Sequence, residues 1–118
     1  MTVADAGISP GSERVRVTVE RIDKPRGATR VGDWFEVVGS RLFLPAGKSF
    51  CPYAMAAVFP IVVMRQADLP ADSWLVRKPW ICGPDAEENL VMRVEAVYDE
   101  PGAPEPESEP ESAAGAAS

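Results

Sequence analysis

The sequence of 118 residues contains no histidine. This absence excludes Ser-His-Asp and Cys-His nucleophile activation, histidine-ligated zinc and an imidazole general base. Cysteine is also scarce, because only Cys51 and Cys82 are present, with thirty residues between them and no C-x-x-C motif. A zinc site built from cysteine alone needs four ligands, so we expect no metal site and no cofactor. Whether the chain is an enzyme stays open at this point.

Long apolar runs are missing as well. The longest stretch without a charged residue, residues 49–64, spans sixteen residues, whereas a transmembrane helix needs about 20. Residues 1–11 lack the basic start and the apolar core of a secretory signal. We therefore predict a cytoplasmic protein that has no membrane partner and whose thiols are reduced.

The charge of the chain is concentrated at its C-terminal end. All 12 lysine and arginine residues and 12 of the 18 acidic residues precede residue 99, so the net charge of -6 comes entirely from residues 99–118. That segment is rich in Pro, Glu and Ala, which predicts a disordered acidic tail of the kind that GC-rich bacterial genomes encode. A neutral body without a basic cluster disfavours nucleic acid. The expected partner is an unknown protein or a small molecule, and a homo-oligomer stays open.

Two segments alternate between apolar and polar residues. In residues 13–22 this alternation places Val15, Val17 and Val19 on one face, and residues 90–98 alternate in the same way. Because a period of two is typical of half-buried strands, we expect two long strands that pair antiparallel in one sheet. Shorter strands are expected at residues 31–39 and 73–76, a further strand or a turn at 40–44, and a turn at 80–85.

The segment that follows Phe50 has a helical period. Its apolar residues recur every four positions and also fill the remaining face, so we expect a core helix that is buried nearly all round. Pro52 fits the first helical position, whereas Pro60 removes an internal hydrogen bond. A kink at Pro60, or two successive short helices of which the second begins there, is therefore expected.

These elements predict an α+β fold, in which a small antiparallel sheet packs on one buried, proline-kinked helix. The single domain is expected at residues 13–98, between a flexible N-terminus at residues 1–12 and the disordered tail.

Cys51 is the strongest candidate for a chemically active residue. It directly precedes Pro52, and a sulfur at a helix start meets unpaired N–H groups and the positive end of the helix dipole, which favour the thiolate. The alternative is that Cys51 is a small buried apolar residue. Cys82 is its natural partner, and a reversible disulfide requires the two Cα atoms to lie about 4.4 to 6.8 Å apart.

Carboxylates and aromatic rings supply the remaining candidates. Asp33 and Asp85 lie near turns, where burial can turn a carboxyl group into a proton donor or acceptor. Asp85 is the better catalytic candidate because it adjoins Cys82, and Asp33 is expected to bind substrate together with Tyr53 and Trp80. A solvated turn carboxylate and a packed ring are the competing interpretations.

The order of several motifs resembles a family of small, largely uncharacterised bacterial and archaeal proteins. The corresponding residues are Gly32-Asp33-Trp34-Phe35, Cys51-Pro52-Tyr53-Ala54, Pro60, and Cys82 with Pro84-Asp85. The resemblance implies a shared fold and draws attention to both thiols, but it implies no particular reaction. Here Gly83 is inserted into the Cys-Pro-Asp motif, and the cysteine and histidine that often precede the glycine-acid step are absent.

Three functions follow as hypotheses. The first is a thiol protein with a redox or ligand-binding role, in which Cys51 is activated and Cys82 is its resolving or ligand partner. The second is a non-catalytic accessory or interaction module that uses the aromatic surface around Trp74 and Trp80. The third is an acid-base enzyme that acts on a small metabolite through Asp33 or Asp85.

Overall fold

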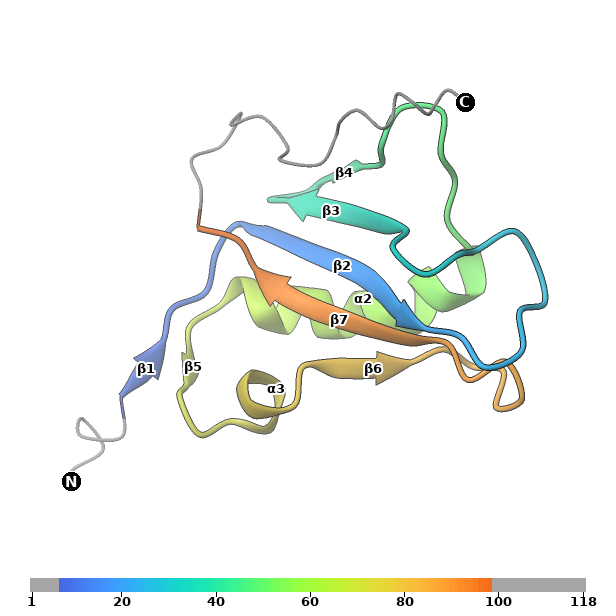
Figure 1. Ribbon diagram of the computed structural model, residues 1–118. Helices are drawn as coiled ribbons and strands as arrows, with labels where there is room; N and C mark the ends of the chain where they lie inside the picture. Colours follow the sequence, from blue (N-terminus) through green and yellow to red (C-terminus); the bar gives the residue numbers. More distant parts are fainter. Residues whose placement is uncertain (1–6, 99–118) are drawn as a thin grey trace.

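The computed structural model describes residues 7–98, whose backbone forms two antiparallel sheets, one long helix and one short helix (Figure 1). The strands of the larger sheet lie in the order β4-β3-β2-β7-β6, and β1 pairs with β5 in a small second sheet. The α+β class is thereby confirmed. The elements in chain order are β1 (Ile8–Ser9), β2 (Arg14–Arg21), β3 (Trp34–Val38), β4 (Arg41–Phe43), α2 (Pro52–Gln66), β5 (Leu69–Pro70), α3 (Trp74–Arg77), β6 (Trp80–Cys82) and β7 (Val91–Ala96).

The two alternating segments form the centre of the larger sheet. β2 and β7 pair antiparallel, with Val15 opposite Ala96 and Val17 opposite Val94, so the predicted pairing is confirmed. β3 pairs with the other edge of β2 and leads into β4 through a two-residue turn. Gly39 has a φ of 62° there, as the first central position of a type II′ hairpin turn requires.

The core lies between this sheet and one stripe of α2. The three valines of β2 are fully buried against Ala54, Val58 and Val62, which recur every fourth residue and therefore share one side of the helix. Figure 1 shows α2 running behind β2 and β7. The expectation that α2 is buried nearly all round is wrong, because eight of its fifteen residues are exposed.

α2 is one continuous helix from Pro52 to Gln66, with Pro60 inside it. Of the two alternatives expected at Pro60, two successive helices are therefore not seen, and the kink stays a prediction. Pro52 stands at the start of the helix, where a backbone N–H has no acceptor within the helix, so the missing N–H of proline costs no hydrogen bond.

Three short elements differ from the sequence-based expectation. Residues 74–77 form a single helical turn, α3, instead of a strand, and residues 80–82 form β6 instead of a turn. β6 pairs with β7 and directs Ile81 toward the core, an arrangement that the turn-forming composition around Gly83 conceals. β1, which pairs with β5, was not expected.

The second face of the sheet carries paired charges. Glu36 is 4% exposed and accepts hydrogen bonds from the Nε atoms of Arg14 and Arg16, at 2.9 and 2.8 Å. The guanidinium of Arg16 also lies 4.1 Å from the ring centroid of Trp34. Burial of a carboxylate is acceptable here because two cations and several N–H groups surround it.

Some predictions fall on residues that are not described. The tail at residues 99–118 lies outside the described residues, as do residues 1–6 of the predicted flexible N-terminus. Within residues 7–98, no helix has the length and apolar character needed to cross a membrane.

Candidate functional site

Cys51 occupies the N-cap of α2. Its backbone is extended, with φ of -61° and ψ of 120°, and its Sγ accepts a hydrogen bond from the N–H of Ala54 at 3.5 Å. The sulfur therefore meets one of the N–H groups that a helix start leaves unpaired. The thiol is free and half-buried against the edge of the core. Its place at the helix start is as expected, and its reactivity stays a prediction.

Cys82 is a free and exposed thiol in β6. Because successive strand residues point to opposite faces and Ile81 packs against the core, Cys82 points away from α2, on the same face as Trp80. Its Sγ lies 4.0 Å from Oδ1 of Asn89. The structure thus places the thiols of Cys51 and Cys82 on different faces of the sheet, which does not favour a disulfide or a shared ligand within one chain.

Asp85 and Asp33 bind backbone N–H groups of their own turns. Oδ1 of Asp85 accepts from the N–H groups of Glu87 and Glu88 at 3.0 and 3.2 Å, and its Oδ2 lies 3.4 Å from Arg26. Oδ2 of Asp33 accepts from the N–H three residues earlier at 2.9 Å. This is the geometry of a turn-stabilising carboxylate. Tyr53, which was also expected to bind substrate, is exposed near the start of α2.

Trp80 lies on the sheet face opposite α2 and belongs to a polar cluster. Its Nε1 donates to Oε1 of Glu20 at 2.8 Å, and the guanidinium of Arg93 lies 5.2 Å from its ring centroid. The hydrogen bond from Arg93, followed by that from Trp80, lowers the pKa of Glu20. Trp74 is exposed on α3, so both rings reach the surface, as the interaction-module hypothesis requires.

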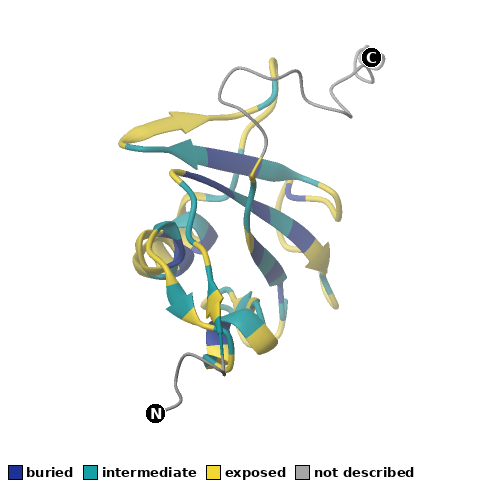
Figure 2. Ribbon diagram, turned by 90° about the vertical axis from the view of Figure 1, so that its left-hand side faces the viewer, coloured by how far each residue is buried: buried dark blue, intermediate teal, exposed yellow. Residues whose placement is uncertain are grey.

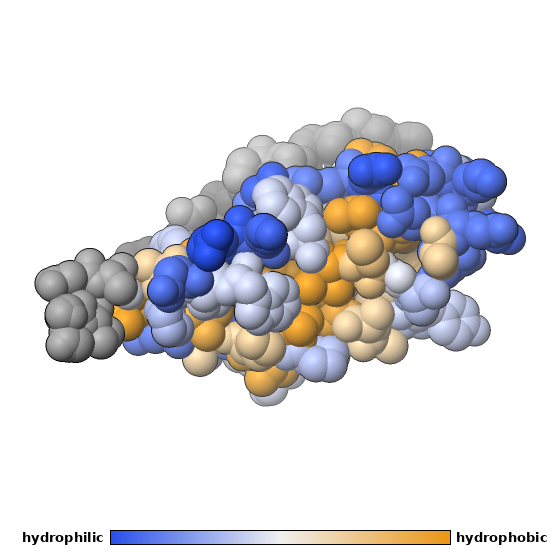
Figure 3. All heavy atoms as spheres, turned by 90° about the horizontal axis from the view of Figure 1, so that it is seen from below, coloured by the Kyte–Doolittle hydropathy of each residue, from blue (hydrophilic) through white to orange (hydrophobic). Residues whose placement is uncertain are grey.

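The outer face of α2 is the most distinctive surface of the described residues. Eight of its fifteen residues are exposed, and none of the eight carries a charge. Figure 2 shows the helix nearly end-on, with its exposed side turned away from the sheet. Figure 3 is seen from the side of α3 and β6 and shows apolar side chains across the middle of that side; it does not look onto the outer side of α2, which faces the rear in Figure 1. We call these eight residues the α2 outer face: Pro52, Tyr53, Ala56, Ala57, Phe59, Pro60, Val63 and Met64.

An aromatic cluster fixes the position of this helix. The ring of Phe35, fully buried on β3, meets the ring of Phe50 edge-on, with centroids 4.8 Å apart and planes at 79°. It also contacts the ring of Phe59, at 6.0 Å between centroids. Phe50 precedes the helix and Phe59 lies in its middle, so β3 holds the first half of α2 at two points.

Sequence reasoning missed the α2 outer face because the helix is apolar all round. A uniformly apolar helix has no polar side that marks its exposure, and the usual interpretation is full burial. The length of the chain is a signal that could have corrected this, since a domain of about 90 residues has only one layer of helix to place on one sheet.

No group of three Cys, Asp or Glu side chains within the described residues 7–98 could hold a metal ion. Comparison of the chain with models of protein families, with curated proteins and with solved structures finds no match. Functional inference therefore depends on the geometry of these surfaces.

Proposed function

We propose that this protein is a non-catalytic interaction module that pairs with a second copy of itself through the α2 outer face. The observation that carries the proposal is that the eight exposed residues of this fifteen-residue helix are all uncharged and almost entirely apolar. Contiguous apolar surface of this kind on a small protein typically marks a binding site, because its exposure to water is unfavourable.

The size of the face fits a small homodimer. Tyr53 is 74% exposed and Val63 is 64% exposed. With about 150 to 250 Å² for a large aromatic side chain, the eight side chains together expose on the order of 600 Å². Two such faces bury about 1,200 Å², at the lower end of specific protein interfaces. We therefore expect a dimer with a dissociation constant in the micromolar range.

The absence of charge favours a second copy as the occupant. Charged surfaces select a partner of opposite sign and repel themselves, whereas an uncharged face pairs with itself without repulsion. In an antiparallel arrangement with two-fold symmetry, small residues in the middle of the helix, Ala56 and Pro60, allow close approach. Tyr53 of one copy then covers Val63 of the other.

The test is sedimentation velocity of the full chain from about 5 to about 300 µM, a range chosen to bracket micromolar dissociation. The variant Val63→Glu places a carboxylate in the apolar contact, so we expect dimerisation to weaken at least about tenfold. Val31→Glu is the matched control, because Val31 is 59% exposed but lies in a loop outside the α2 outer face.

A wild-type chain that stays monomeric over the whole range would rule out the homodimer. Equal effects of Val63→Glu and Val31→Glu would show that the α2 outer face is not the contact. If the wild-type chain is monomeric and instead binds an apolar helix of another protein, the occupant proposed here is the wrong one.

A thiol function at Cys51 is the second candidate, and the hydrogen bond from Ala54 to its Sγ is the observation that favours it. Since Cys82 faces away from α2, such a function would use Cys51 without Cys82. The test is the rate of alkylation of the Cys82→Ser variant at graded pH. If the alkylation rate stays high at pH values below about 8.5, the pKa of an ordinary cysteine thiol, the result supports an activated thiolate. If the rate depends on pH as it does for an ordinary cysteine, the thiol function is refuted.

A further inference from the structure

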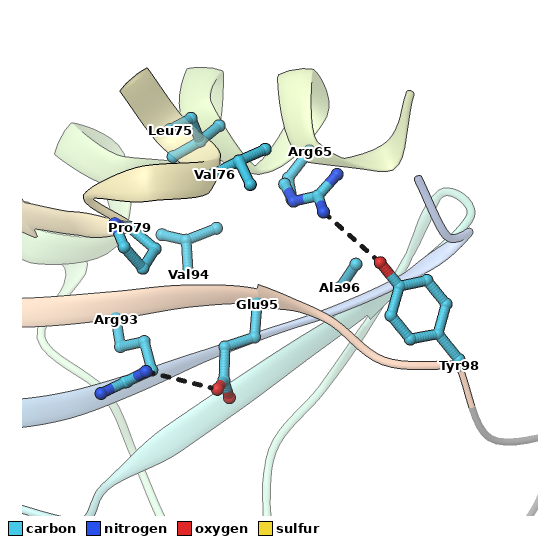
Figure 4. A pocket seen from close by; sticks show the side chains of 9 residues that line it. All are labelled: Arg65, Leu75, Val76, Pro79, Arg93, Val94, Glu95, Ala96 and Tyr98. Carbon is cyan, nitrogen blue, oxygen red and sulfur yellow. Dashed lines mark hydrogen bonds and ion pairs between the residues drawn. The ribbon is translucent and has the colours of Figure 1, made fainter. Parts of the chain in front are cut away.

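A second site lies away from the α2 outer face, at the opposite side of the helix near its C-terminal end. A cavity of about 180 Å³ opens between the end of α2, α3 and the last residues of β7 (Figure 4). Its wall is mixed: Leu75, Val76, Pro79 and Val94 supply apolar groups, and the charged residues Arg93 and Glu95 of β7 also line it. One cationic side chain, Arg65, contributes from α2.

Arg65 is buried and incompletely paired. Its residue is 6% exposed, and its Nη2 donates to Oγ of Ser9 at 2.7 Å and to the hydroxyl of Tyr98 at 3.4 Å. Its Nη1 is closed to solvent and has no hydrogen-bond acceptor among the described residues. No carboxylate of residues 7–98 lies within ion-pair distance of Arg65.

The charged residues on the neighbouring strand do not neutralise Arg65. Arg93 and Glu95 pair with each other at 3.8 Å, and Figure 4 shows both side chains on the opposite side of β7 from Arg65. The C-terminal end of α2 lends Arg65 some favourable negative potential. A helix end supplies only a partial charge, however, and a buried cation with unmade hydrogen bonds is costly without an anion.

A backbone donor lies beside the same cavity. The N–H of Val94 donates to the carbonyl of Pro79 at 2.8 Å, on the side of β7 where β6 begins. Strand geometry repeats every two residues, so the N–H of Ala96 points to that side too, beyond the start of β6. Ala96 lines the cavity, and an anion at Arg65 therefore has a backbone donor nearby.

We propose that this cavity binds a carboxylate with a short apolar body, with its negative charge at Arg65 and its carbon chain against Val76 and Val94. One arginine balances the single charge of a carboxylate, whereas a phosphate would bring a second negative charge that Arg65 alone does not balance. At about 30 Å³ per water-sized group, the volume accommodates roughly six non-hydrogen atoms. The carboxylate belongs either to a free small molecule or to the chain itself, since Asp99 and Glu100 follow Tyr98 in the sequence.

The experiment titrates the ¹⁵N-labelled full chain with butyrate, which has six non-hydrogen atoms, and with butyramide, its neutral isostere. We expect saturable shifts of the Ala96 amide and the Arg65 Nε–H with butyrate, with a dissociation constant of about 1 mM. Butyramide should bind at least about tenfold more weakly, because it leaves the guanidinium charge unbalanced. Equal binding of the two compounds would overturn the proposal.

Two variants locate the site. Arg65→Met keeps an unbranched, shorter side chain and removes the charge, and Val76→Phe fills the cavity while leaving Arg65 in place. Each should weaken butyrate binding at least about tenfold. Butyrate binding that survives Val76→Phe in a folded protein would overturn the proposal even if Arg65→Met does not fold.

A third variant, Asp99→Asn with Glu100→Gln, distinguishes the two sources of the carboxylate. If the wild-type chain binds butyrate as well as this variant does, the site takes a free ligand. If only the variant binds butyrate, the carboxylate of the chain itself occupies the site. If neither protein binds butyrate, the proposal is wrong.

Discussion

Replacement of Phe35 by leucine tests how firmly the sheet holds α2. Leucine retains most of the buried apolar surface of Phe35 but removes its ring contacts with Phe50 and Phe59. Each aromatic pair contributes about 0.5 to 1.5 kcal/mol beyond its burial, and the cavity that the smaller side chain leaves adds about 0.5 kcal/mol. We therefore expect the free energy of unfolding to fall by about 1.5 to 3.5 kcal/mol.

This loss is large for a domain of this size, whose total stability is about 5 to 14 kcal/mol. Urea unfolding followed by tryptophan fluorescence measures it, at one protein concentration because dimerisation would add a concentration-dependent term. Phe43→Leu is the matched control, since Phe43 lies exposed on the edge strand β4, and we expect it to cost less than about 0.5 kcal/mol. Similar losses for the two variants would refute the argument that the Phe35 ring positions the helix.

Two further predictions concern the chain ends and the polar cluster. Gly11→Ala should destabilise the protein by more than about 1 kcal/mol in the same assay, because the Cβ of an alanine at this position would lie 2.3 Å from the backbone of Ala67. Gly27→Ala is the control and should be neutral, because a Cβ added there has no atom within 4 Å. The lowered pKa of Glu20 means that its bond to Arg93 stabilises the folded state above pH 4.5, and that this contribution is lost as the pH falls through the lowered value. Glu20→Gln should therefore lower the free energy of unfolding by less than about 1 kcal/mol near neutral pH. Below pH 4.5 the free energy of unfolding of this variant should depend less on pH than that of the wild-type protein; the same pH dependence in both proteins would contradict this.

The parts of the fold that the sequence predicts are those with a single strong period. Val15, Val17 and Val19 alternate with charged residues, and only an antiparallel sheet with one buried face satisfies that pattern. Short elements gave no such signal. Residues 80–82 became a strand because β7 offers an unpaired edge beside them, and that edge is a tertiary feature absent from local sequence.

The candidate site was predictable in its local geometry and not in its surroundings. The position of Cys51 at a helix start follows from Pro52 alone. The face to which Cys82 points depends on the register of β6 against β7. A three-residue strand followed by Gly83 and Pro84 is too short for its sequence to specify that register. Arg65 was not a candidate, because an arginine that ends an apolar helix is normally solvated, and its burial results from contacts with segments that lie far away in the sequence, such as the one at Ser9.

Both ends of the described chain are tied to each other. The hydroxyl of Tyr98 donates to the carbonyl of Pro10 at 2.7 Å, and Oγ of Ser12 donates to the carbonyl of Val97 at 2.6 Å. A short linker could therefore join the ends, and new termini could be opened in the exposed loop around Gly27 without breaking the sheet. Such a circular permutant would carry fused reporters at the opposite end of β2 from the place where Ser12 and Val97 meet.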